Sequence, residues 1–144
     1  MKALTIMPEY AMNIALGEKT VEVRTWKTNY RGPLLITSSA RRHKGLIAGY
    51  ALCTVNLIDC VPLTKSLAKK ALMKWEPGMG DLYYAWILDE NNLIIPQPVK
   101  GKLSLWECDC PIIYPEFKQV EEKDGIILLD TEDFFAKHWD PITC

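Results

Sequence analysis

Residues 17–24 read Gly-Glu-Lys-Thr-Val-Glu-Val-Arg, and they mark the point in the chain where the spacing of apolar side chains changes from that of a helix to that of a strand. The preceding residues 10–16 keep apolar side chains at helical spacing, and Gly17 is well placed to end that helix in a left-handed cap. After the cap the period is two, so the two valines point one way and the glutamate and arginine the other. The stretch predicts a helix, a cap and a half-buried strand with a charged face.

Short apolar strands account for most of the remaining pattern. A second helix is expected over residues 63–74 with Thr64 as its N-cap, and Asn91-Asn92 are expected to form a turn. Several short strands with only two core-sized helices predict an α+β protein built on a β-barrel with two or three flanking helices. The strands are expected at residues 4–6, 21–24, 34–37, 46–60, 83–88, 93–95, 99–106 and 125–129.

The charges divide the chain into two parts. Residues 1–106 hold 14 basic and 8 acidic side chains, whereas residues 107–144 hold 3 basic and 10 acidic ones. A length of 144 residues fits one domain. With 49% hydrophobic and 24% charged residues the composition is that of a globular protein. We expect a barrel domain over residues 1–106 and an acidic C-terminal extension, residues 107–144, packed on it.

Composition also excludes several classes of protein. The longest apolar stretch is far shorter than the roughly 20 residues that cross a bilayer, and residues 1–10 lack the apolar run of a secretory signal. The five cysteines are odd in number and form no C-x-x-C pair, which argues against a disulfide scaffold and a structural metal site. A cytoplasmic protein without cofactor, metal or membrane partner is expected, and its oligomeric state is left open.

Lys19, Glu22 and Arg24 are the residues most suited to chemistry. A carboxylate between two cations stays ionised and can act as a general base or accept a hydrogen bond from the amino group of a base. A guanidinium can bind a phosphate or carboxylate with two hydrogen bonds. The alternative is a surface ion-pair ladder, which contributes about 0 to 1 kcal/mol.

The same segment resembles the signature of the ASCH family, a branch of the PUA-like superfamily. That signature is G-x-K-x-x-E-x-R, and Gly17, Lys19, Glu22 and Arg24 fill its four fixed positions. The resemblance extends in order over nearly all of residues 3–106. The further matching blocks are residues 3–11, 28–36, 38–40, 48–49, 59–60, 85–88 and 98–106.

The resemblance implies a PUA-like β-barrel whose signature residues line a basic cleft between barrel and helices. It implies single-stranded RNA or a nucleotide derivative as the ligand, and Lys19 and Glu22 as candidate catalytic residues of a ribonuclease-like hydrolase. One branch of the family hydrolyses acylated nucleosides and shares the lysine, but it has a catalytic threonine where this chain has Glu22. A non-catalytic RNA-binding or regulatory module is the alternative from another class, so whether the chain is an enzyme stays open.

Further ligand-binding candidates surround the signature. Tyr10 takes the place of the family's usual tryptophan and is a candidate for stacking on a base, or else a packing residue of the helix. Ser38 is a candidate phosphate contact, although serines at strand ends usually satisfy backbone groups. Arg41 and Lys100 would extend a basic track for a phosphate backbone. Trp86 is the last candidate, with burial in the core as its alternative.

Overall fold

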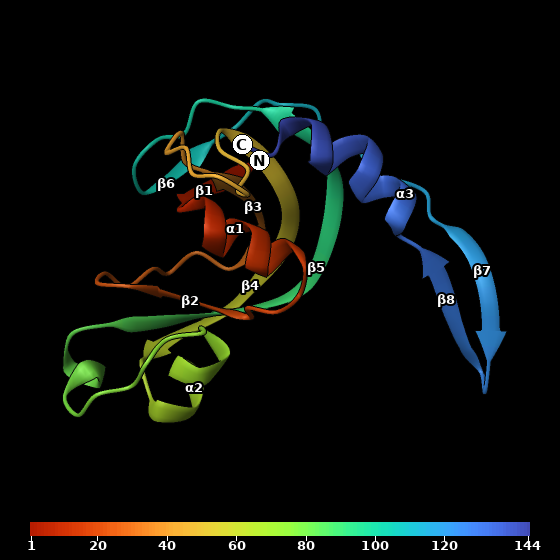
Figure 1. Cartoon of the computed structure of the whole chain (residues 1–144). Helices are drawn as coiled ribbons and strands as arrows, with labels where there is room; N and C mark the ends of the chain where they lie inside the picture. Colours follow the sequence, from red (N-terminus) through yellow and green to blue (C-terminus); the bar gives the residue numbers. More distant parts are fainter.

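The computed structural model describes the backbone of residues 1–144 and all side chains except those of residues 118–123 and 126–130. Its centre is a six-stranded curled sheet in the order β2-β5-β4-β3-β1-β6 (Figure 1). β1 pairs in parallel with β3, and the other neighbours are antiparallel. The strands are β1 (Lys2–Ile6), β2 (Val21–Arg24), β3 (Gly32–Ser38), β4 (Tyr50–Pro62), β5 (Tyr84–Pro98) and β6 (Leu105–Glu107).

The two long strands β4 and β5 curl the sheet into a half-barrel (Figure 1). Their pairing shifts register at three places, between Ala51 and Cys53, Thr54 and Asn56, and Leu57 and Asp59. Bulges of this kind bend a strand and increase its twist, so the long β4–β5 pair can follow the curve of the half-barrel. The expected turn at Asn91-Asn92 is wrong, because β5 runs through it and Asn92 pairs with Thr54. Those polar residues lie instead beside a bulge.

Helix α1 (Pro8–Ala15) packs on the concave face of the sheet and supplies Ala11 and Ile14 to the main core. Pro8 stands in its first turn, where a missing amide hydrogen costs nothing. The core also takes Leu34 from β3 and Trp86 from β5, both with 0% exposure. The helix and strand predicted on either side of Gly17 are therefore confirmed.

Helix α2 (Lys65–Lys70) is shorter than the helix expected over residues 63–74. Thr64 caps its N-terminus as expected, since the Thr64 side chain accepts a hydrogen bond from the amide of Leu67 at 3.3 Å. The helix ends where Leu72 takes a left-handed φ of 57°. Ala68 and Ala71 pack with Val21 in a second core cluster beneath β2.

The acidic C-terminal residues join the barrel at several points. The expected strand 99–106 is wrong for residues 99–104, which lie outside the sheet. Its last two residues belong to β6, which pairs with β1 and ends one residue after the expected boundary at 106. Phe134 and Trp139 lie in the main core. Between these parts, β7 (Lys118–Lys123) and β8 (Ile126–Asp130) form a hairpin that projects from the barrel, followed by α3 (Glu132–Phe134) and the π-helical turn Phe135–Trp139 (Figure 1).

Across the residues that the structure describes, none of the helices has the length and apolar character needed to cross a membrane.

Candidate functional site

The turn between α1 and β2 fixes the start of the signature segment. Gly17 has φ of +79°, a left-handed conformation that favours glycine. The amides of Glu18 and Lys19 both donate to the carbonyl of Asn13, at 2.9 and 3.1 Å. Asn91 of β5 closes the turn by donating its Nδ2 to the carbonyl of Ala15 at 3.2 Å. The chain therefore enters β2 in one defined direction.

Glu22 is buried, with 5% of its surface exposed, so the expected solvent-facing charged surface of β2 is wrong. The face of β2 that carries Val21 packs on α2, and Glu22 lies on the opposite face, between Lys19 and Arg24. Glu22 pairs in register with Trp86 of β5, a fully buried residue. The ion-pair ladder on an exposed strand is therefore not what this segment forms.

Lys19 lies beneath the cleft described below and connects three elements. It is 4% exposed, and its Nζ donates to the carbonyl of Ala71 at the end of α2 at 2.7 Å. The same nitrogen lies 3.6 Å from Glu22 Oε1 and 5.0 Å from the centre of the Tyr10 ring. Burial lowers the pKa of Lys19, against the opposing attraction of Glu22.

The carboxylate of Glu22 is held at both oxygens. Oε1 accepts from the amide of Val23 at 3.1 Å, and Oε2 accepts from Arg24 Nη2 at 3.3 Å. Arg24 Nη2 also donates to the carbonyl of Thr5 at 3.2 Å. Within the part of the chain whose side chains are described, the buried Arg24 Nε has no hydrogen-bond partner. The pair is thus fixed in place while Arg24 keeps an unused donor.

A cleft of about 960 Å³ opens over this pair, between the end of β1, the start of α1, β2, the end of β5 and the loop 99–104. Its size is at the upper end of small-molecule pockets, which occupy about 300–1,000 Å³. The side chains of Tyr10, Met7 and Leu103 give it apolar walls, and Lys100 and Lys102 add positive charge. The remaining lining residues are Thr5, Ile6, Glu22, Val23, Arg24, Ser39, Ala40, Pro98, Val99, Gly101 and Ser104.

The sequence matches the ASCH domain over residues 4–132, most of the chain. This chain belongs to the ASCH domain family. The match extends past residue 106, where the resemblance read from the sequence ends. No curated protein matches the sequence.

The fold is similar to solved ASCH structures. The crystal structure of ASCH from Zymomonas mobilis superposes with a TM-score of 0.54 at 19% identity, covering 75% of this chain and 87% of that one. A tyrosine-to-phenylalanine variant of the Zymomonas mobilis protein gives a TM-score of 0.52 at 19% identity, with 75% and 90% covered. At this identity the likeness concerns the fold.

In this ASCH domain the loop 99–104 forms one wall of the cleft and lies against Thr5, which also bonds to Trp106 just after the loop. The Thr5 hydroxyl accepts from Trp106 Nε1 at 3.0 Å and lies 2.9 Å from the hydroxyl of Thr37. A Cβ added to Gly101 would meet the Thr5 methyl group at 2.5 Å, so the loop approaches β1 as closely as glycine allows. Lys102 Nζ lies 5.7 Å from the centre of the Trp106 ring.

The structure brings four of the predicted site residues to the cleft and places the others elsewhere. Tyr10, Glu22, Arg24 and Lys100 line it, with Lys19 directly behind Glu22. Ser38 is fully buried, and its hydroxyl is engaged by both the amide and the carbonyl of Tyr50. Trp86 is in the core, edge-on to Trp26, and Arg41 is an exposed loop residue.

Sequence reasoning missed Thr5, which joins Arg24 to the wall of the cleft, and Leu103, which is 94% exposed. A threonine in an apolar strand carries no distinct signal. Leu103 falls in the strand expected at residues 99–106, where its neighbours alternate in polarity. Its exposure beside two lysines becomes apparent only when residues 99–104 are known to form a loop.

Proposed function

We propose that this ASCH domain binds single-stranded RNA or a nucleotide derivative in the cleft above Glu22 and Arg24. The observation that carries the proposal is the fixed Glu22–Arg24 pair lining a cleft of about 960 Å³ whose wall also carries Lys100 and Lys102. The family is proposed to bind RNA. The PUA-like type of the barrel and the division at residue 106 belong to the same proposal.

The roles of the two side chains follow from their hydrogen-bonding capacity. Glu22 Oε2 has room for a donor besides Arg24, and the exocyclic amino group of a base is such a donor. Arg24 donates to a phosphate or to the O6/N7 edge of a guanine, each of which has the geometry to accept two hydrogen bonds. Tyr10, which is 38% exposed at the mouth of the cleft, stacks on the base.

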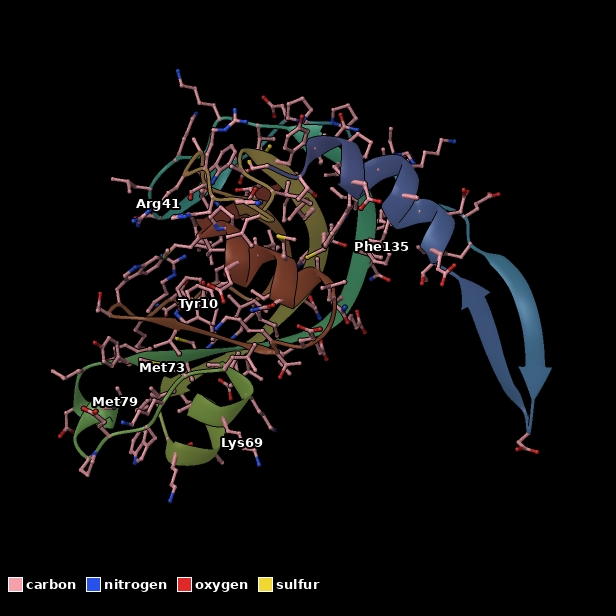
Figure 2. The ribbon with its side chains drawn as sticks, in the orientation of Figure 1. Tyr10, Arg41, Lys69, Met73, Met79 and Phe135 are labelled. Carbon is pink, nitrogen blue, oxygen red and sulfur yellow. The ribbon has the colours of Figure 1, made fainter. Side chains whose placement is uncertain are left out.

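Positive charge around the cleft supports an anionic ligand. Lys100 and Lys102 stand on its wall, and Arg41, Arg42 and Lys44 are exposed on the loop that follows Ala40. Figure 2 labels Arg41 on this loop. Each phosphate that a cation neutralises releases counterions, with a slope of about −0.7 in log affinity against log salt for single strands. Binding to RNA is thus expected to weaken steeply as salt rises.

The experiment is fluorescence anisotropy with labelled single-stranded RNA and the variants Glu22→Gln, Arg24→Gln and Lys137→Gln. Loss of affinity in the first two variants, with Lys137→Gln unchanged, supports the cleft. Lys137 is an exposed lysine of the C-terminal segment, and Lys137→Gln is the charge-matched control for Arg24→Gln. Equal affinity of all four proteins would refute the cleft as the RNA site.

Hydrolysis of the bound ligand is the second candidate function, because the lowered pKa of Lys19 next to a carboxylate is typical of sites that transfer protons. Glu22 would act as the general base on water or a ribose hydroxyl, and Arg24 would stabilise the developing negative charge. Lys19 lies behind Glu22 and would act on the reaction only by positioning the Glu22 carboxylate. Incubation with RNA and with acylated nucleosides, followed by mass spectrometry, should give products that disappear in Glu22→Gln. Identical products from that variant would rule out Glu22 as the general base.

A further inference from the structure

A second groove lies on the outer side of α2, away from the signature cleft. It has a volume of about 540 Å³ and lies between α2 and the segment that leaves it. Met73 and Trp75 form its apolar surface, and Lys65, Ser66 and Lys69 form its edge. Figure 2 shows Lys69 and Met73 on α2 and the segment after it, below Tyr10.

The helix side of this groove is basic, whereas the exposed Glu76 follows Trp75. Lys65, Lys69, Lys70 and Lys74 are all exposed, and they lie within ten consecutive residues. Trp75 is half-buried, so one part of its ring is anchored in the second core cluster and the rest stays accessible. Cations beside an accessible aromatic ring are the elements with which proteins hold single-stranded nucleic acids.

The groove is held in a fixed position relative to the cleft. The carbonyl of Lys70 accepts from the amide of Thr20 at 3.2 Å, and that of Ala71 accepts from Lys19 Nζ at 2.7 Å. Val23 lines the cleft and packs in the same core cluster as Met73 and Trp75. Cleft and groove are therefore separated by the thickness of β2 and that cluster.

β2 itself leaves a route between the two sites. It is the terminal strand of the sheet, and Figure 1 shows it between α1, which borders the cleft, and α2, which borders the groove. A terminal strand has an edge that does not pair within the sheet, although here the amides of Thr20 and Val23 already donate to Lys70 and Glu22. A nucleic-acid backbone that leaves the cleft can cross this edge and reach the lysines of α2.

We propose that the Lys65–Lys69–Trp75 groove is a second contact for the same RNA strand, so that its binding footprint extends from the cleft across β2. This inference rests on the proposed function. Trp75 stacks on a base, and Lys65 and Lys69 neutralise phosphates. The stacking surface favours RNA over an acidic peptide, because an acidic peptide would use the lysines and leave the ring unoccupied.

The test compares a labelled trinucleotide, which the cleft alone can hold, with a dodecanucleotide that reaches beyond it. The variants are Lys65→Gln/Lys69→Gln, Glu22→Gln and the control Lys137→Gln, all at a series of salt concentrations. We expect the double variant to lower the salt slope for the dodecanucleotide by about 1.4, from two phosphate contacts at about 0.7 each, and to leave trinucleotide binding unchanged. A dodecanucleotide with 4-thiouridine should also crosslink to Met73 or Trp75 on irradiation.

The possible outcomes separate this inference from the proposed function. If Glu22→Gln weakens both ligands while the double variant weakens neither, the cleft stands and the second contact is refuted. If the double variant weakens the dodecanucleotide while Glu22→Gln has no effect, RNA binds at the groove without the cleft, which refutes the proposed function and with it the footprint that joins the two sites. If neither RNA binds, the cleft and the second contact are both refuted. If a poly-glutamate peptide displaces the dodecanucleotide only from the groove, the groove binds acidic peptides and the inference is overturned.

Discussion

Replacing Lys19 by methionine tests whether this lysine holds the site together or contacts the ligand. Methionine keeps the apolar part of the side chain but removes the ammonium group, which contacts the carbonyl of Ala71 at 2.7 Å and Glu22 at 3.6 Å. The side chain is 4% exposed, so solvent cannot replace those partners. The variant should lose stability and lose ligand affinity together.

The size of the loss follows from the groups left behind. A buried carbonyl without a donor costs about 1–3 kcal/mol, and Glu22 is left with Arg24 as its single cation. The lowered pKa of Lys19 shows that burying the ammonium is itself unfavourable, and its removal offsets part of the cost. We expect a net loss of about 2 kcal/mol in the free energy of unfolding, which corresponds to roughly 4–8 °C in Tm for a chain of this size.

The assay is urea unfolding at neutral pH, followed by tryptophan fluorescence, with Lys27→Met as the control at an exposed lysine. The control should stay within about 0.5 kcal/mol of the original protein. The cost of Lys19→Met should be smaller in a Glu22→Gln background, because the carboxylate charge is then absent. An unchanged free energy of unfolding combined with lost affinity would refute the positioning role and indicate that Lys19 touches the ligand.

Two further predictions concern pH and the cleft wall. Burial lowers the pKa of Lys19 in the folded chain below its ordinary value of 10.5. At pH values between the folded pKa and 10.5, Lys19 is protonated in the unfolded chain and neutral in the folded chain. The free energy of unfolding should therefore rise with pH across that window relative to Lys19→Met, and parallel pH profiles in urea unfolding would contradict it. Gly101→Ala should cost about 1–3 kcal/mol and weaken RNA binding, because its Cβ would lie 2.5 Å from the Thr5 methyl group. Thr5→Ala removes both the methyl and the hydroxyl, which would lie 2.5 and 2.8 Å from that Cβ. In differential scanning fluorimetry Gly101→Ala should therefore cost less in a Thr5→Ala background than in the original protein, and an equal cost would place the clash elsewhere.

Local sequence patterns predicted the elements whose signals are complete within a few residues. The helix before Gly17, its left-handed cap and the strand after it are all present, because spacing and backbone conformation act over short distances. The Thr64 cap was predicted for the same reason. The alternating run 99–106 misled, because alternation describes a strand only where a partner edge exists, and β1 pairs with its last residues alone.

By itself, then, the sequence determined the family, the α+β class and the residues that meet at the centre of the site. Only the tertiary structure decided that Glu22 is buried, that Lys19 stands behind it on the carbonyl of Ala71, and that residues 98–104 form a wall of the cleft. The physical reason is distance along the chain. Ala71 lies more than fifty residues from Lys19, and Gly101 lies more than ninety residues from Thr5. No periodicity in the sequence relates positions so far apart, and they meet only once the sheet has curled.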